Sequence, residues 1–316
     1  MPADAGMPAV SVIVVSYNVR EHLLRALRSV LAGRGLSLEV IVVDNASQDG
    51  SADAVAQEFP QVRLIRLPEN RGYAAANNVG LGECHGSHVL LLNPDMVLDP
   101  DAVAKLSDFL TVHSEVGAVG PRILRPDGRP DPAARRSFPT LWVAALRMSG
   151  LSRLFPRSPL VARYNMGHIS AESSHEIDSG TGACLLVRRH ALEEVGLFDT
   201  DYFLYGEDLD LCLRLRAAGW AIYYLPTAVG THFKGASASQ RPLESIYEFH
   251  RAMWTFYRKH YAVRYLAALQ VVVWLAIWTR WCLLATRALL LLQWQTRAAT
   301  PLTRQDQRIE ELPQDA

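Results

Sequence analysis

The sequence lacks an excess of charge of either sign, because 32 lysine and arginine residues balance 32 aspartate and glutamate residues. No global electric field would therefore steer the protein onto nucleic acid, and we expect no nucleic-acid partner. Cysteine is also scarce: Cys84, Cys184, Cys212 and Cys282 include no Cys-x-x-Cys pair and no metal-site spacing. We interpret the four as buried thiols in a reducing compartment.

Residues 1–9 lack a basic segment followed by an apolar core, so the sequence predicts no secretory signal and a cytoplasmic location. Internal repeats are also missing. A chain of 316 residues can bury one large core or two modest ones.

Short apolar runs alternate with amphipathic segments over the first third of the chain. The runs predict buried strands at 10–16, 40–43, 62–67 and 89–92. The segments between and after them predict helices at 21–31, 51–59, 72–81 and 101–113. This alternation is typical of an α/β protein with a mostly parallel sheet and helices on both faces.

Residues 125–174 break this alternation, because prolines and arginines are frequent there and periodicity is weak. We interpret this stretch as an irregular excursion over the surface. Regular structure is expected to return with a strand at 182–187, a helix at 207–218 and a strand at 221–225. We therefore expect one domain at 1–240 and a separate helical region at 241–316.

The C-terminal region changes in character. Residues 247–261 predict an aromatic and basic helix, and 266–292 are overwhelmingly apolar apart from Arg280 and Arg287. Two arginines on one face of such a helix favour a position in the plane of a membrane interface. The tryptophans expected at headgroup depth are Trp274, Trp278, Trp281 and Trp294. A buried or oligomeric helix is the competing interpretation, and the arginines disfavour a membrane span.

Residues 198–211 place several acids between an aromatic loop and the start of a helix. A desolvated carboxylate with aromatic walls suits a general base that takes a proton from a sugar hydroxyl. A simpler interpretation is that Glu207, Asp208 and Asp210 only occupy a helix N-terminus, where the helix dipole favours acids. This segment alone does not decide between the two.

Two more acids end predicted strands: Asp44 follows 40–43, and Asp95 follows 89–92 after Asn93 and a proline. Ligands of open parallel sheets gather beyond the carboxyl ends of strands, so neighbouring strands would bring both acids to one crevice. Each acid also fits an ordinary turn. Two such acids on successive units favour a site.

Two weaker signals accompany these acids. Gly72 opens a helix of small residues whose free N–H groups would suit a diphosphate, and Arg71 adds a charged donor. His232 lies in a segment that we expect to be irregular. Its imidazole would suit a metal ion, although a lone histidine is more often a packed residue.

Together these segments resemble family 2 glycosyltransferases of the GT-A fold. Residues 11–18 are similar to the opening strand of that family, 43–50 to its nucleotide-binding turn, and 91–95 to its metal motif. The segment 180–189 and the pair Glu207-Asp208 complete the family pattern in the expected order. The resemblance covers about 10–235 and is specific because five separated motifs agree. The segments Asn-Arg-Gly-Tyr-Ala-Ala-Ala-Asn-Asn and Tyr-Gly-Glu-Asp-Leu-Asp-Leu-Cys-Leu-Arg are similar to the rhamnosyltransferase-like branch.

The resemblance implies a role for each matched residue. Asp44 would bind the nucleotide base, Asp95 and His232 would hold Mg²⁺ or Mn²⁺ against the diphosphate, and Asp208 would be the catalytic base. The metal motif has one carboxylate instead of a full Asp-x-Asp, so phosphate oxygens and water would complete the site, which Mg²⁺ tolerates. The other expected donor-binding residues are Ser16, Tyr17, Asn18, Asn45, Arg71, Gly72, Asn77 and Asn93. Those expected on the acceptor side are Gly182, Ala183 and Glu207.

The activity implied by the resemblance is an inverting, metal-dependent sugar transfer, with rhamnose favoured, from a dTDP- or UDP-linked donor. The expected acceptor is a glycan or a polyprenyl-linked glycan of cell-wall or other cell-surface polysaccharide synthesis. The expected location is the cytoplasmic face of the membrane, as a peripheral or monotopic protein.

Three other functions compete with this one. The main alternative is a non-catalytic sugar-nucleotide-binding scaffold subunit. A nucleotidyltransferase is disfavoured because 16–19 stand where its glycine-rich loop would follow the first strand. A processive synthase is disfavoured because it would need several membrane spans.

Overall fold

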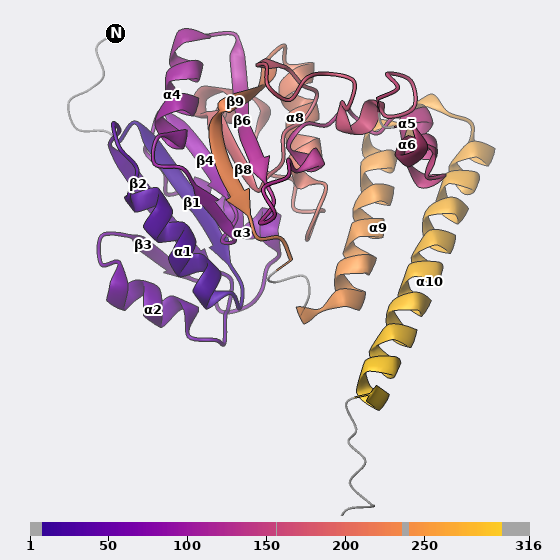
Figure 1. Cartoon of the computed structure of the whole chain (residues 1–316), viewed down its shortest axis with the longest axis horizontal. Helices are drawn as coiled ribbons and strands as arrows, with labels where there is room; N and C mark the ends of the chain where they lie inside the picture. Colours follow the sequence, from indigo (N-terminus) through magenta and orange to yellow (C-terminus); the bar gives the residue numbers. More distant parts are fainter. Residues whose placement is uncertain (1–7, 156, 236–239, 299–316) are drawn as a thin grey trace, which may run out of the picture. The chain divides into compact units, whose positions relative to one another are not determined.

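The computed structural model describes residues 8–155, 157–235 and 240–298, with the backbone alone described at 153 and 294–298. The chain divides into two compact units, one ending at Gln240 and the other beginning at Arg241. Figure 1 shows the ribbon of both units, which are described separately below.

The first unit contains one sheet with the strand order β3-β2-β1-β4-β8-β6-β9-β5, and β7 pairs with β9. Its strands are β1 Val10–Ser16, β2 Leu38–Asp44, β3 Arg63–Arg66, β4 His88–Leu92, β5 Met96–Leu98, β6 Val116–Leu124, β7 His175–Glu176, β8 Cys184–Arg188 and β9 Ala221–His232. The pairs within β3-β2-β1-β4 are parallel, whereas β8 runs antiparallel to β4 and β6. The predicted α/β class is confirmed, and parallel pairing holds mainly in the N-terminal part of the sheet.

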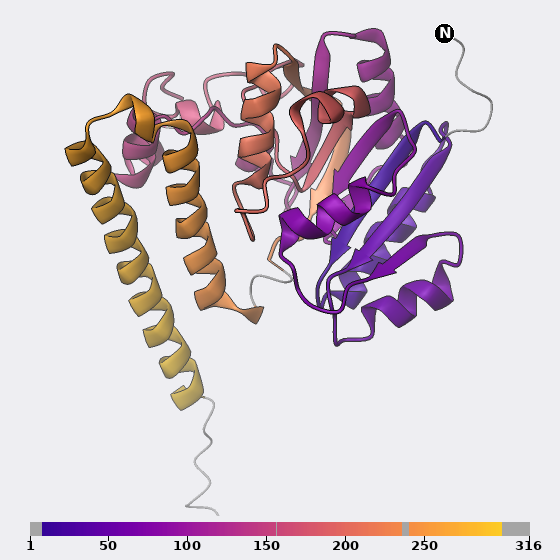
Figure 2. The ribbon, with the colours of Figure 1, turned by 180° about the vertical axis from the view of Figure 1, so that it is seen from behind.

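Helices cover both faces of this sheet. The helices of the first unit are α1 Arg20–Leu31, α2 Ser51–Glu58, α3 Tyr73–Leu81, α4 Ala102–Val112, α5 Leu141–Met148, α6 Leu151–Leu154, α7 Arg189–Val195 and α8 Glu207–Ala217, of which α5 and α6 pack mainly against each other. Helix α1 lies in front of the sheet in Figure 1, and α3 lies in front of it in Figure 2, which is seen from behind. Because both faces are covered, every residue of β1 and β4 is buried, which explains their continuously apolar sequences.

Several sequence-based expectations about the first unit are wrong. The sequence did not predict β5, β6 or β7, and β9 does not end at residue 225. The ladder between β6 and β9 shifts register after Pro121, and β9 then continues to His232. His232 therefore lies on a strand and pairs with Met96 of β5, instead of lying in an irregular segment. Pro226 interrupts the apolar run and imitates a strand end.

The stretch 125–174 is also more regular than expected. It contains α5, α6 and two short 3₁₀ turns, Pro132–Ala134 and Arg163–Asn165. Thr140 caps α5, because its side-chain oxygen accepts a hydrogen bond of 3.4 Å from the Val143 nitrogen. Among the cysteines, Cys84, Cys184 and Cys212 are buried as expected, but Cys282 is exposed.

The second unit is built from α9 Pro242–His260, a 3₁₀ turn at Ala262–Arg264 and α10 Ala267–Ala298. α10 packs along α9, and the Arg280 Nη1 atom lies 2.8 Å from the Nε2 atom of His250. Arg287 is exposed, so the two arginines of the predicted shared face have different surroundings. The side chain of Trp294 lies outside the described residues. Within the described part of the chain, one helix, 267–293, is long and apolar enough to cross a membrane.

Candidate functional site

The candidate site lies at one edge of the sheet, where β1, β2 and β4 end and β8 begins. Ser16 is in register with Asp44, which places the first two strand ends side by side. The Asn93 nitrogen donates a hydrogen bond of 2.9 Å to the carbonyl of Ala183, which ties the end of β4 to the start of β8. The sheet therefore gathers motifs that are far apart in the sequence.

Asp44 is a buried acid with one unused oxygen. Its Oδ2 atom accepts a hydrogen bond of 3.1 Å from the Ser47 nitrogen, whereas Oδ1 has no hydrogen-bond partner among the described residues. The hydroxyl of Ser16 is also buried without a described partner. Buried acceptors need donors, and the N–H group of a pyrimidine base is a suitable one.

The turns after β1 and β2 hold one another in place. Asn18 has a left-handed backbone with φ of 53°, and its nitrogen donates 3.0 Å to the Ser47 hydroxyl. The Gln48 nitrogen in turn donates 2.7 Å to Oδ1 of Asn18. Tyr17 is half-buried beside them. Hydrogen bonds between the two turns therefore fix one wall of the site, which contains Ser16, Tyr17, Asn18, Asp44 and Asn45.

Asn45 connects this wall to the segment before α3. Its Nδ2 atom donates 2.9 Å to Oδ1 of Asn70, and its Oδ1 atom accepts 2.9 Å from the Arg71 nitrogen. The Arg71 side chain is exposed. Asn77 lies further along α3, where Nδ2 donates 2.9 Å to the Tyr73 carbonyl and Oδ1 is buried without a described partner.

The start of α3 is in close contact with the loop 199–206. Gly72 has φ of +80°, and a Cβ atom there would lie 2.5 Å from the Phe203 carbonyl oxygen. The next residue, Tyr73, donates its N–H to the same carbonyl at 2.7 Å. The amide group of Asn78 makes two hydrogen bonds with the backbone of Phe198, of 2.8 and 2.9 Å. These contacts require glycine at residue 72.

Tyr73 contacts the segment that precedes β8. Its hydroxyl donates 3.0 Å to the Gly182 carbonyl. Burial raises the pKa of Tyr73, and the negative charges of Glu207, Asp208 and Asp95 raise it further. The Gly182 nitrogen donates a hydrogen bond to Oδ2 of Asp208, so Gly182 joins Tyr73 to this carboxylate.

Asp95 and His232 form a buried pair, with 3.0 Å between Oδ1 and Nε2. Burial alone would raise the pKa of Asp95. The hydrogen bond and the charge of His232 outweigh this effect of burial, so the pKa of Asp95 is lowered. The Nδ1 atom of His232 is buried without a hydrogen-bond partner, 3.9 Å from Oδ2 of Asp131. Lys234 Nζ lies 2.6 Å from the same Asp131 oxygen.

This pair has the chemistry of a partial metal site. Mg²⁺–oxygen bonds of about 2.0–2.1 Å place neighbouring octahedral ligands about 2.9 Å apart, close to the observed separation of Asp95 and His232. The described residues contain no group of three or more His, Cys, Asp or Glu side chains that could hold a metal ion. Asp95 and His232 therefore fit an ion that takes its other ligands from phosphate and water.

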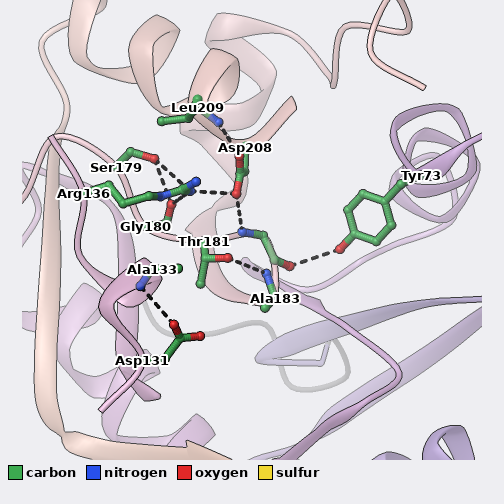
Figure 3. Close-up of polar contacts among 11 residues, drawn as sticks. Tyr73, Asp131, Ala133, Arg136, Ser179, Gly180, Thr181, Ala183, Asp208 and Leu209 are labelled. Carbon is green, nitrogen blue, oxygen red and sulfur yellow. Dashed lines mark hydrogen bonds and ion pairs between the residues drawn. The ribbon is translucent and has the colours of Figure 1, made fainter. Parts of the chain in front are cut away.

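Asp208 is held at the start of α8 by three donors (Figure 3). Its Oδ2 atom accepts 2.9 Å from the Gly182 nitrogen and 2.7 Å from Nη2 of Arg136, and Oδ1 accepts 2.7 Å from the Leu209 nitrogen. The neighbouring Glu207 is buried, and Oε2 has no described partner. Burial and then the charge of Asp208 raise the pKa of Glu207 to about 8. At neutral pH this raised pKa favours the protonated form of Glu207.

The structure brings together most of the residues that the sequence singled out. Hydrogen bonds connect Asn93, Gly182, Ala183 and Asp208, Glu207 directly precedes Asp208, and Asp95 pairs with His232. The adjacent wall contains Ser16, Tyr17, Asn18, Asp44 and Asn45. The roles of these residues remain predictions. Sequence reasoning missed Arg136 and Asp131, which lie in the stretch expected to be irregular. The sequence marks Arg136 only as part of the basic pair Arg135-Arg136, and no pattern links it to Asp208.

Comparisons with known proteins show what this chain is similar to. The family described as "Glycosyltransferase like family 2" matches residues 8–262. An N-acetylglucosaminyl-diphospho-decaprenol L-rhamnosyltransferase of Mycobacterium tuberculosis is 34% identical over 256 residues, covering 78% of this chain and 82% of that protein.

Solved structures share the fold at low identity. The structure of GalNAc-T7 with UDP, GalNAc and Mn²⁺ has a TM-score of 0.56 and 16% identity, and the match covers 84% of this chain but only 54% of that one. The structure of Staphylococcus aureus TarS residues 1–349 has a TM-score of 0.53 and 17% identity, over 86% of this chain and 71% of that one.

Proposed function

The chain belongs to glycosyltransferase-like family 2, and on this premise we propose that it transfers rhamnose from a nucleotide diphosphate sugar to a polyprenyl-linked glycan, with inversion at the anomeric carbon. The observation that carries this proposal is the set of contacts at the carboxyl ends of the strands, where Gly182 joins Tyr73 to Asp208 and Asp95 pairs with His232. Sugar transfer needs a carboxylate base and a separate group that holds the leaving diphosphate, and this edge supplies both.

The donor nucleotide would lie against the wall formed by Asp44, Ser16 and Asn45. The unpartnered Oδ1 atom of Asp44 would accept the N–H group of the base. Uracil and thymine both carry this group, so the contact suits UDP- and dTDP-linked donors alike. The preference for rhamnose rests on the name of the mycobacterial relative.

The diphosphate would lie near Asp95, His232 and the N-terminus of α3. Asp95 and His232 would hold Mg²⁺ or Mn²⁺, which when bound neutralises the charge that develops on the leaving diphosphate. The Mn²⁺ named with the similar GalNAc-T7 structure supports this assignment. Arg71, exposed just before α3, would add a positive charge on the same side.

Asp208 would act as the general base. It takes the proton of an acceptor hydroxyl while that oxygen forms a bond to the anomeric carbon. The bond from this carbon to the diphosphate oxygen breaks on the opposite face, and the nucleotide diphosphate leaves with the electron pair. A single displacement of this kind inverts the configuration of the sugar.

The acceptor side is assigned to Gly182, Ala183, Glu207 and the stretch 125–174, within a catalytic domain at 1–240. The region 241–316 would bring the protein to the cytoplasmic face of a membrane, where a polyprenyl-linked acceptor lies. Large apolar side chains are exposed along α10, including Val272, Leu275 and Leu283. They support membrane contact, since a water-soluble surface rarely exposes so continuous an apolar face.

A donor panel tests the proposal. The full chain is incubated with Mn²⁺, a short-chain polyprenyl-diphospho-N-acetylglucosamine and, in turn, dTDP-rhamnose, UDP-N-acetylglucosamine and UDP-glucose. We expect release of dTDP from the first donor and an acceptor heavier by one rhamnose. Binding of a donor without release of nucleotide or hexose transfer would instead favour a non-catalytic scaffold subunit.

A further inference from the structure

Arg136 reaches Asp208 from a segment far away in the sequence. Its backbone forms an antiparallel bridge with Ser179, with both N–H to carbonyl hydrogen bonds 3.0 Å long. Its Nη2 atom also donates to the Ser179 hydroxyl at 3.3 Å and to the Gly180 carbonyl. The side chain is only 11% exposed. Figure 3 shows it lying beside Asp208 on the side away from Tyr73.

A count of the lone pairs of Asp208 identifies its reactive oxygen. A carboxylate offers about four lone-pair sites, two on each oxygen. Arg136 and the Gly182 N–H group occupy both sites on Oδ2, and the Leu209 N–H group occupies one site on Oδ1. The remaining site is on Oδ1, so only this oxygen can take a proton without breaking a contact.

The ion pair also places a positive charge beside one acid of the Glu207-Asp208 pair. Two adjacent buried carboxylates cannot both ionise easily. Arg136 bonds directly to Asp208, whereas Glu207 has an oxygen without a described partner. Burial disfavours the charged guanidinium, yet Asp208 more than offsets this and raises the pKa of Arg136. The positive charge therefore stays beside Asp208 over the whole working pH range.

We propose that Arg136 is the positioning residue of the catalytic base, which fixes Oδ2 of Asp208, directs Oδ1 to the acceptor and holds a positive charge beside this carboxylate. The inference rests on the proposed function. Arg136 belongs to the stretch 125–174, which follows β6 in the chain. The segment assigned to the acceptor side would therefore also hold the Asp208 carboxylate in position.

The test compares Arg136→Gln, Arg136→Lys and a control, Arg214→Gln, in the full chain. Arg214 forms a similar pair with Asp210 on α8, 2.8 Å from Nε to Oδ2, and takes no part in the proposed chemistry. The measurement is the pH dependence of kcat, with dTDP-rhamnose and polyprenyl-diphospho-N-acetylglucosamine at saturation. A binding titration gives the donor Kd of each variant, and circular dichroism reports folding.

For Arg136→Gln we expect the acidic limb of log kcat to move up by about one pH unit or more, because an opposite charge favours the ionised form by that order. We expect kcat at neutral pH to fall about tenfold or more, a donor Kd within about twofold, and partial recovery in Arg136→Lys. The control should keep the wild-type limb. A changed KM with an unmoved limb would overturn the positioning role alone. A wild-type chain that releases no nucleotide from any donor would overturn both proposals.

Discussion

Oδ1 of Asp95 and Nε2 of His232 lie 3.0 Å apart although 137 residues separate them in the sequence. The pairing of Met96 with His232 in the β5–β9 ladder produces this contact, because Asp95 directly precedes β5. A metal ion held here would depend on the pairing of β5, the last strand in the strand order, with β9.

Asp95→Asn and His232→Gln are expected to weaken metal binding. In the wild type, Mn²⁺ added with dTDP should raise the Tm, since a ligand that binds only the folded chain stabilises it. The two variants should lose most of this increase. His85→Gln is the control, because His85 is an exposed histidine paired with Glu39. A Mn²⁺-dependent rise in Tm that is equal in all four proteins would contradict the assignment.

Asp208→Asn should abolish most of the transfer while donor binding remains. General base catalysis contributes about 10²–10⁴-fold, so kcat should fall by that factor. The donor Kd should stay within about twofold, since Asp208 contacts no part of the nucleotide in the proposed arrangement. Glu193→Gln, which changes an exposed acid on the neighbouring α7, serves as the matched control. Near-normal turnover in Asp208→Asn would show that another group takes the proton.

Asp44→Asn should raise the donor KM and leave kcat nearly unchanged. The amide replaces one of the two carboxylate oxygens with an NH2 donor, so it cannot accept both from the Ser47 N–H group and from the nucleotide base at the two oxygen positions. An unmade buried hydrogen bond costs about 1–3 kcal/mol, which corresponds to a rise in KM of about 5- to 150-fold. Asp53→Asn alters an exposed acid on α2 and should have no effect. A donor KM equal to that of the wild type would exclude Asp44 from base recognition.

Glu207 should make the stability of the chain fall as the pH rises from about 4.5 to about 8. Its pKa is raised from 4.5 to about 8 in the folded chain, so the unfolded chain loses this proton first and gains stability relative to the folded one over this interval. Glu207→Gln keeps the shape and removes the titration, so its free energy of unfolding should change less over the same interval. Denaturant unfolding at pH 5, 7 and 9 measures the difference. Parallel pH profiles for the two proteins would contradict the raised pKa.

Removal of residues 266–316 should release the protein from membranes. Vesicle sedimentation should find the full chain in the pellet and the shortened chain in the supernatant, because the exposed apolar side chains of α10 are lost. Val112→Glu changes a similarly exposed apolar residue on α4 and should not alter sedimentation. Equal pelleting of the shortened chain would remove α10 from the membrane contact.

The sequence predicted the elements with a strong period and missed those with mixed signals. β1, β2 and β4 are continuous apolar runs, and α1 has a clear apolar stripe, so all four were found. β6 contains Gly117, Gly120 and Pro121, residues that normally end strands, and it was missed. Pro226 likewise explains why the predicted strand stops at residue 225, although β9 continues to His232.

The site was predictable where local motifs carry it. Asp44, Asp95 and Asp208 belong to short segments of recognisable composition, so the sequence identified them. Arg136 reaches Asp208 across 72 residues through a bridge to Ser179. Such a contact depends on tertiary packing, which no periodicity or spacing in the sequence reports. The same holds for the Asp131 carboxylate near His232.

Gly72 limits how the enzyme could be altered for new sugars. Any side chain at this residue would meet the Phe203 carbonyl, so a substitution would push apart the helix on the donor side and the loop before Glu207. Directed evolution that varies Phe203 or its neighbours can explore many sequences, whereas libraries that include residue 72 would consist largely of misassembled variants.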